Sequence, residues 1–208
     1  MKLLIKISTF FAIIFTSISI AYGAASSAYE IKPIKVGENI PDVAVLDKEG
    51  SEQSLKSISE NKSTLFIFFR GEWCPYCNLH LAELQKIEKK LKDLGVQIVA
   101  LTPDKPEKIA PNIEKNKLTY SIYSDRKMLA AEGFGVAFWI DDATHGALLN
   151  FGVDLKEESG EHRRLLPVPA AFLVDKLGKI KFAYANPDYK VRVDTDKLLS
   201  EAEKLLAE

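Results

Sequence analysis

The fold is decided by residues 64–77, with the sequence TLFIFFRGEWCPYC, where an apolar run meets the start of a helical pattern. Residues 64–69 have the composition of a buried strand, and residues 78–94 place leucines at helical spacing. Cys74 and Cys77 form a C-x-x-C pair at this strand-to-helix junction, which is the local signature of thiol–disulfide chemistry. They are the two cysteines of the chain, so any disulfide formed within it joins them.

The place of each cysteine in this motif predicts its role. We expect Cys74 at the very start of the helix, with Pro75 at the first helical position, where its missing N–H costs nothing. The free N–H groups there lower the pKa of the Cys74 thiol below its ordinary range. Cys77, one turn further along, is then placed to attack a mixed disulfide formed by Cys74. A purely structural bridge is the alternative, but closing so short a loop removes little unfolded-state entropy.

Residues 1–23 predict a secretory signal peptide. Lys2 and Lys6 form a basic start, residues 10–15 are apolar, and Ala21-Tyr22-Gly23 is a suitable cleavage site. An uncleaved membrane anchor is the alternative, but five Ser and Thr residues make the segment a poor membrane span. We therefore expect an exported protein, periplasmic or secreted, with no stable membrane association after cleavage. In an oxidising compartment the cysteine pair is expected to rest as a disulfide.

The composition of the rest of the chain limits the kinds of partner and cofactor that we expect. The formal net charge is −1 and the basic residues are spread along the chain, so a nucleic-acid partner is not expected. The three histidines, His80, His145 and His162, form no second spaced pair, so a zinc site is not expected. Two thiolates can still hold a soft metal, and a non-enzymatic metal-binding or structural module stays an alternative. With no Gly-rich nucleotide motif we expect no cofactor, and an external thiol reductant or reductase must supply electrons.

Strands and helices alternate after residue 36, which predicts a single α/β layered domain over residues 36–208 behind a connecting segment at 24–35. Residues 137–166 are the least regular part, and we expect an insertion there that could form the interface of a homo-oligomer. The remaining expected elements are a strand at 40–46 that enters a hairpin, a central strand at 96–101, a strand at 118–123, helices at 105–117, 127–132 and 197–207, and a late hairpin at 170–184.

Val168-Pro169, just before the late hairpin, is a second candidate site. A cis proline that faces the cysteines is one interpretation, and a trans proline at the start of an edge strand is the other.

These motifs together resemble the peroxiredoxin-like branch of the alkyl hydroperoxide reductase and thiol-specific antioxidant (AhpC/TSA) family, within the thioredoxin-fold superfamily. The resemblance implies a central mixed β-sheet flanked by helices, with an N-terminal β-hairpin and an insertion before the C-terminal hairpin. It also implies a substrate groove formed by Trp73, Pro75, Tyr76, Val168 and Pro169. The stretches that carry it are 68–77, 123–125, 133–136, 166–175 and 186–192.

The resemblance leaves open which cysteine reacts first. In a thioredoxin register, Cys74 attacks a disulfide and Cys77 resolves the intermediate. In a peroxiredoxin register, Cys77 is oxidised by a hydroperoxide to a sulfenic acid and Cys74 resolves it. That register puts Cys74 where the family has a peroxide-orienting hydroxyl and Pro169 where it has an activating arginine. We therefore expect a thiol–disulfide oxidoreductase, with a thiol-dependent peroxidase as the alternative.

Two further residues are candidates for tuning the thiols. Arg70 either replaces the missing cation or is a surface arginine at a strand end. His80, three residues beyond Cys77, either tunes that thiol or is a half-exposed helix histidine, and we expect the latter. Asp188-Tyr189 and Arg192 are interpreted as a loop ion pair.

Overall fold

The computed structural model describes residues 23–207, so the expected signal peptide lies outside the described residues except for Gly23. Seven strands form the central sheet: β1 (Ala44–Leu46), β2 (Glu52–Ser54), β3 (Ser63–Phe68), β4 (Val96–Thr102), β5 (Ser121–Ser124), β8 (Ala170–Val174) and β9 (Ile180–Ala185). The helices around it are α1 (Leu55–Ser59), α2 (Pro75–Asp93), α3 (Pro106–Asn116), α4 (Leu129–Gly133) and α7 (Thr195–Leu206). No helix within residues 23–207 is long and apolar enough to cross a membrane.

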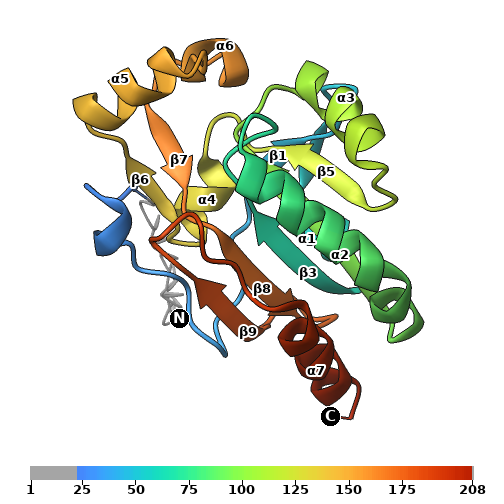
Figure 1. Ribbon diagram of the computed structural model, residues 1–208. Helices are drawn as coiled ribbons and strands as arrows, with labels where there is room; N and C mark the ends of the chain where they lie inside the picture. The colour runs from blue at the N-terminus through green and yellow to red at the C-terminus, as the bar shows by residue number, and fades with distance from the viewer. Residues whose placement is uncertain (1–22, 208) are drawn as a thin grey trace, which may run out of the picture.

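The sheet is mixed, in the order β2-β1-β5-β4-β3-β8-β9 (Figure 1). Strands β3, β4 and β5 are parallel neighbours, whereas β8 runs antiparallel to β3 and pairs Ala170 with Phe68. The first hairpin pairs Ala44 with Ser54. The expected mixed sheet, N-terminal hairpin and late hairpin are therefore confirmed, and the strands differ from their expected bounds by a few residues.

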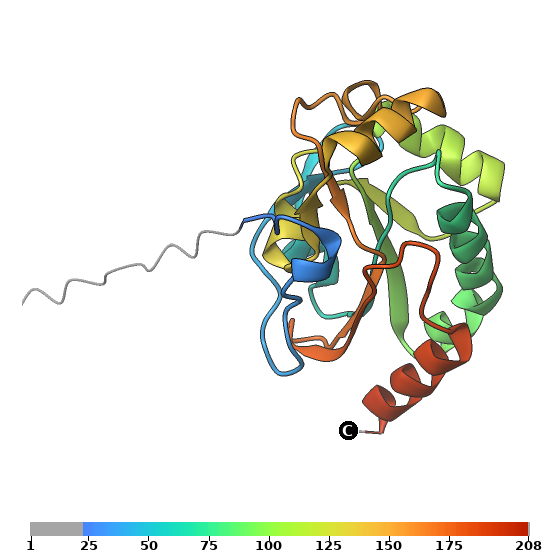
Figure 2. The same ribbon diagram turned by 60° about the vertical axis from the view of Figure 1, so that its left-hand side comes forward.

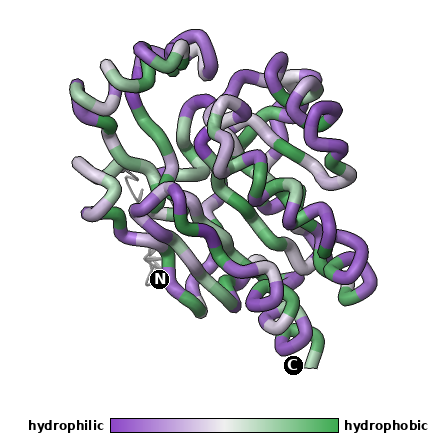
Figure 3. Tube along the Cα trace, viewed as in Figure 1, coloured by the Kyte–Doolittle hydropathy of each residue, from purple (hydrophilic) through white to green (hydrophobic). Residues whose placement is uncertain are grey.

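Two hydrophobic cores cover the two faces of the sheet, because successive strand residues point to opposite sides. Leu65 and Ile67 pack on α2, α3 and α7, whereas Phe66 and Phe68 pack on α1, α4 and the aromatic ring of Phe134. Figure 2 shows the three longer helices on one side of the sheet and α4 with the N-terminal segment on the other. Apolar residues follow the central strands in Figure 3, and hydrophilic residues gather on the outer turns.

Helix α2 begins at Pro75 and continues through the leucine pattern to Asp93. Cys74 is its N-cap residue and Pro75 its first residue, as expected from the sequence. Leu81, Leu84 and other buried residues fix the inner face of the helix on the sheet. The helix ends before Gly95, which has φ +75° and donates its N–H to Lys92 O.

Residues 24–35 were expected to be a connecting segment in front of the domain, but they form a strap that packs across α4. Lys32 N–H donates to Gly135 O and Ile34 N–H donates to Phe134 O, and one 3₁₀ turn (Ala28–Glu30) lies within the strap. Gly135 has φ +69°, and a Cβ there would lie 1.9 Å from Lys32 O. The strap therefore depends on a glycine at this position.

The expected insertion at 137–166 forms a second layer above the strand ends (Figure 1). It contains β6 (Ala137–Trp139) paired with β7 (Leu165–Pro167), and between them α5 (Asp142–Asn150) and α6 (Leu155–Ser159). A third hydrophobic cluster holds it in place and includes Trp73 of the C-P-Y-C loop. The insertion is thus built onto the segment that carries the cysteines.

Candidate active site

The dithiol lies where β3 ends and α2 begins, so the strand and the helix fix it from both sides. Cys74 is the N-cap of α2, and Cys77 is in its first turn. Both are free thiols, and each side chain is only 1 % exposed. The structure is therefore that of the reduced pair, and the Cys74–Cys77 disulfide stays a prediction.

The two sulfurs have unequal environments. The neighbouring Cys77, through its thiol and its backbone N–H, lowers the pKa of Cys74 to about 6, an effect that burial opposes and the charges of Arg70 and Arg192 assist. Burial, followed by the contact with Cys74, raises the pKa of Cys77 above its ordinary range. The helix N-terminus also favours negative charge on Cys74. Cys74 is therefore the sulfur that ionises first.

Arg70 is a buried cation beside the dithiol, not a surface arginine. Its side chain is 7 % exposed, and its guanidinium carbon lies 5.2 Å from the ring centre of Trp73 and 4.5 Å from that of Tyr189. Burial lowers its pKa, and the charges of Cys74 and Cys77 oppose that effect. Within residues 23–207 it has no ion pair with a carboxylate, so aromatic faces and the thiols provide its stabilisation.

Arg192 is the second cation of the site, and its expected ion pair with Asp188 is wrong. Its Nη2 donates to Cys77 Sγ at 3.3 Å, and the N–H of Arg70 approaches the same sulfur at 3.5 Å. Asp188 instead accepts the N–H of Lys190. The sequence did not show this contact because it joins positions 115 residues apart.

Two tyrosines pack together beside the dithiol. Tyr76 of the motif and Tyr189 of the loop between β9 and α7 meet edge to face, with ring centres 5.8 Å apart. They are 41 % and 39 % exposed, whereas Cys74 and Cys77 are buried. Because Cys74 is buried, a large substrate can reach it only after neighbouring side chains move.

His80 is buried, which corrects the expectation of a half-exposed histidine. Its side chain is 5 % exposed, and its Nε2 has no hydrogen-bond partner among residues 23–207. Burial, and then the charge of Arg192, lowers the pKa of His80 to about 4. The ring is therefore neutral at neutral pH. The spacing Cys77, His80, Leu84 already places it on the buried face of α2.

Val168 and Pro169 do not form the expected groove wall. No cis peptide bond occurs within residues 23–207, so Pro169 is trans. Val168 is buried in the hydrophobic core on the face of the sheet opposite the cysteines. Pro169 is buried as well, and its carbonyl accepts the N–H of Asn186. It precedes β8, an interior strand, so it is not at an edge either.

The remaining candidates are placed as follows. Trp73 packs against two of the hydrophobic clusters, and Pro75 is exposed beside Tyr76. Sequence reasoning missed Asp104, a buried carboxyl that follows β4 and accepts the N–H of Glu72 at 2.9 Å. A lone aspartate after a strand carries no signal of that burial. Within residues 23–207 no group of three or more His, Cys, Asp or Glu residues is arranged to hold a metal ion.

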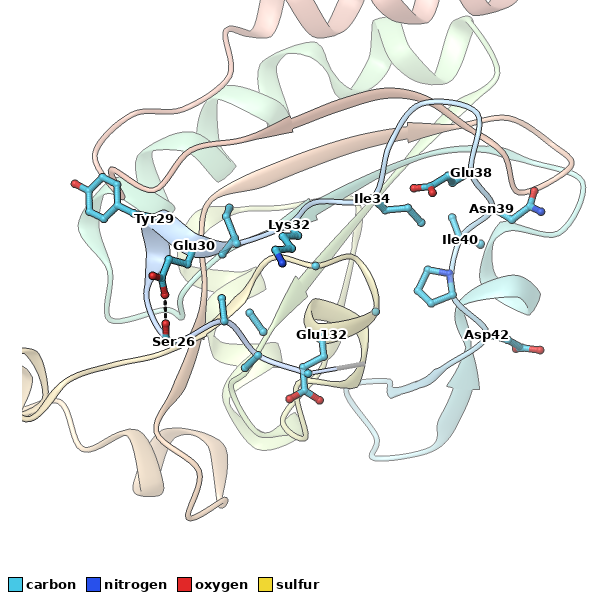
Figure 4. Close-up of a pocket in the computed structure, with 18 of the residues that line it drawn as sticks. Ser26, Tyr29, Glu30, Lys32, Ile34, Glu38, Asn39, Ile40, Asp42 and Glu132 are labelled. Atoms are coloured by element: carbon cyan, nitrogen blue, oxygen red, sulfur yellow. Dashed lines mark hydrogen bonds between the residues drawn. The ribbon is translucent and has the colours of Figure 1, made fainter. Parts of the chain in front are cut away.

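The wide hollow of about 1300 Å³ in Figure 4 is a separate feature. The N-terminal strap and α4 line it, and Ser26 hydrogen-bonds to Glu30 at its rim. None of its lining residues belongs to the dithiol site. Glu132, which points toward it, is ion-paired with Arg163.

Comparisons with known proteins agree with the fold and with the cysteine chemistry. A model of the AhpC/TSA family matches residues 36–183. The peroxiredoxin Bcp of Escherichia coli K12 is 27 % identical over 170 residues, which cover 82 % of this chain and 96 % of that protein. The thiol-disulfide oxidoreductase ResA of Bacillus cereus is 25 % identical over 150 residues, 71 % of this chain and 68 % of that protein. The crystal structure of a peroxiredoxin-like protein from Aquifex aeolicus has a TM-score of 0.66 at 18 % identity, with 88 % and 98 % of the two chains covered.

Proposed function

The chain belongs to the AhpC/TSA family and is a thiol-dependent oxidoreductase, and from that premise we propose that it exchanges disulfides through Cys74 and Cys77. The observation that carries the proposal is the position of Cys74 as the N-cap residue of α2, where free backbone N–H groups favour a thiolate. This position makes Cys74 the attacking thiolate, while burial raises the pKa of Cys77 and keeps a proton on it.

In the first step the Cys74 thiolate attacks one sulfur of a substrate disulfide. A Cys74–substrate S–S bond forms, the substrate S–S bond breaks, and the leaving sulfur departs as a thiolate that takes a proton from solvent. Arg70 and Arg192 lie close enough to the dithiol to lower the pKa of Cys74 by their charge.

In the second step Cys77 loses its proton and attacks the Cys74 sulfur of the mixed disulfide. The Cys74–Cys77 bond forms, the Cys74–substrate bond breaks, and the second substrate sulfur leaves as a thiolate that takes up a proton, so two electrons have passed to the substrate. Arg192 is hydrogen-bonded to Cys77 Sγ and stabilises the thiolate needed for this attack. An external dithiol reductant then returns the enzyme to the reduced state.

One observation favours a second candidate function, a thiol-dependent peroxidase. Arg192 Nη2 and the backbone N–H of Arg70 both point at Cys77, as donors to a peroxidatic thiolate would. A peroxide is also small enough to reach a buried sulfur more easily than a protein disulfide can. Cys77 would then break the O–O bond, become a sulfenic acid and condense with Cys74 with loss of water.

Stopped-flow kinetics on two serine variants separates these functions. With Cys77→Ser we expect a stable mixed disulfide on Cys74 when a disulfide substrate is added, identified by mass spectrometry. With Cys74→Ser we expect slow reaction with hydrogen peroxide. Rapid peroxide consumption by Cys74→Ser would instead establish Cys77 as peroxidatic and refute the disulfide-exchange proposal.

We also propose that the chain acts outside the cytoplasm after loss of residues 1–23. The charge pattern of that segment supports export. N-terminal sequencing of the protein from the extracytoplasmic fraction should begin at Ala24 or close to it, and an intact Met1 in the cytoplasmic fraction would refute it.

A further inference from the structure

A small cavity lies beside Arg70 and Trp73, which precede the C-P-Y-C motif, and no step of the proposed reaction uses it. The volume that the centre of a water molecule can occupy there is about 10 Å³, so the cavity has room for one water molecule. Arg70, Trp73, Asp104 and Glu158 line it together with apolar residues that include Leu155 and Leu166. The catalytic loop, the segment after β4 and the insertion therefore meet around it.

Four buried polar atoms at this cavity have no hydrogen-bond partner among residues 23–207. They are Arg70 Nε, Trp73 Nε1, Asp104 Oδ1 and Glu158 Oε2, two donors and two acceptors. Asp104 is 1 % exposed, and its other oxygen already accepts the N–H of Glu72. Unpaired buried polar atoms are costly, and a bridging water is the usual solution where the space allows it.

Gly71 lets two of these atoms lie close to its backbone. A Cβ at this position would lie 2.3 Å from Trp73 Nε1 and 2.7 Å from Asp104 Oδ1. The residue also has φ +141°, which disfavours other side chains. The backbone is therefore shaped to bring the indole and the carboxyl to one small space.

We propose that this cavity is a binding site for one water molecule, which links Asp104 to Arg70 and Trp73 and makes Asp104 a positioning residue for the dithiol. The water accepts hydrogen bonds from Arg70 Nε–H and Trp73 Nε1–H. It donates to Asp104 Oδ1 and to the carboxylate of Glu158, whose Oε2 is also 3.1 Å from Lys108 Nζ. Four partners complete the hydrogen bonding of one water.

The protonation state of Asp104 decides whether all four hydrogen bonds of this water molecule can form. Burial raises the pKa of Asp104 to about 7. Because Oδ2 accepts from Glu72, a proton on the carboxyl sits on Oδ1, where it competes with the two other donors for the water's two lone pairs. Protonation therefore leaves either Arg70 or Trp73 without its partner.

The charged groups that face Asp104 come from several elements. Glu72 in the catalytic loop and Glu158 of α6 favour its protonated form, whereas Lys108 of α3 interacts with its charge. Arg70 lies across the cavity. The effect of Asp104 on catalysis rests on the proposed function, since it acts by holding Arg70 beside Cys74.

The indole N–H of Trp73 is a direct probe of this site. In ¹⁵N-tryptophan protein carrying Cys74→Ser and Cys77→Ser, so that no thiol titrates, we expect its NMR signal to shift with a midpoint near pH 7. In the same background, Asp104→Asn should give a pH-independent signal at the low-pH position, because an amide leaves a donor unpaired at every pH. Trp139, which packs under Arg163 at the surface, is the internal reference.

Three results would overturn the proposal. They are a Trp73 signal that does not titrate, a signal that still titrates in Asp104→Asn, and a crystal structure of the full chain whose cavity holds no water. The first and third measurements use an unaltered Asp104, so they do not depend on whether Asp104→Asn folds.

Alkylation of Cys74 in the otherwise unaltered chain tests the positioning role. Asp104→Asn should slow reaction with iodoacetamide at pH 7 by about threefold to tenfold, the effect of breaking one buried hydrogen bond. The matched control is Asp125→Asn, another buried carboxyl with a pKa raised to about 7 by burial, but one that accepts the N–H groups of Ala130 and Ala131. Equal rates in the two variants would overturn the positioning role. If the chain shows no disulfide exchange while the Trp73 titration persists, the proposed function fails and the water site stands.

Discussion

Two loops meet at the dithiol, and they differ in how their roles are encoded. The loop at 69–74 is continuous with its strand and helix, so a local motif places Cys74, Trp73 and Arg70. The loop at 186–194 lies more than a hundred residues further on, and it supplies Arg192 and Tyr189 through tertiary packing alone. In the proposed reaction the first loop provides the nucleophile, and the second provides the positive charge of Arg192 and the ring of Tyr189. The comparison teaches that the reactivity of a local motif can be set by a distant segment.

The strongest test of these separate roles of the two loops is removal of the proposed nucleophile, Cys74. Cys74→Ser should abolish disulfide exchange, a loss of several orders of magnitude, because no other thiolate can make the first attack. Cys77→Ser should still form the mixed disulfide but should not release it. Turnover assays with mass spectrometry of the trapped species check both, and exchange by Cys74→Ser would break the assignment.

Arg192→Met tests the charge that the distant loop provides. Loss of the donor at Cys77 Sγ should raise the pKa of Cys77 further and slow resolution of the mixed disulfide about threefold for each unit of pKa, because the smaller thiolate fraction is partly offset by a more nucleophilic sulfur. Rapid-quench kinetics measures that step directly. Arg192→Lys should lose less because it keeps the positive charge, and an unchanged resolution rate in Arg192→Met would show that the contact is not functional.

Tyr189→Ala tests whether the pair of tyrosines limits access to Cys74. With the ring gone from above Arg70 and beside Tyr76, a bulky maleimide should label Cys74 several-fold faster, whereas iodoacetamide should gain little. Tyr29→Ala is the matched control, since Tyr29 is exposed on the N-terminal strap. Equal acceleration by both reagents would indicate a general loosening instead of an access barrier.

The smallest effect is expected at Asp188. Its carboxylate accepts the N–H of Lys190 within the loop and does not pair with Arg192. Asp188→Asn should therefore change the exchange rate by less than about twofold, as is usual for surface substitutions. A large loss of the exchange rate would instead support the ion pair between Asp188 and Arg192 that the sequence predicts.

Local patterns predicted most of the fold but only part of the site. The apolar run at 64–69, the leucine spacing of α2 and Gly95 were sufficient for the strand, the helix and its end, because each depends on near neighbours. His80 was misplaced although the same helical spacing contains the signal of its burial. Arg192 and Asp104 had no such signal, because their roles depend on which distant segments pack together.

The most direct test of the central claim is to map which sulfur of the reduced protein reacts first. The protein is treated briefly with less than one equivalent of iodoacetamide across pH 4 to 9, and the modified cysteine is identified by peptide mass spectrometry. We expect the label on Cys74, with a rate that rises through a midpoint near pH 6 as the thiolate forms and is flat above pH 7. Preferential labelling of Cys77 would contradict the account and make Cys77 the leading sulfur.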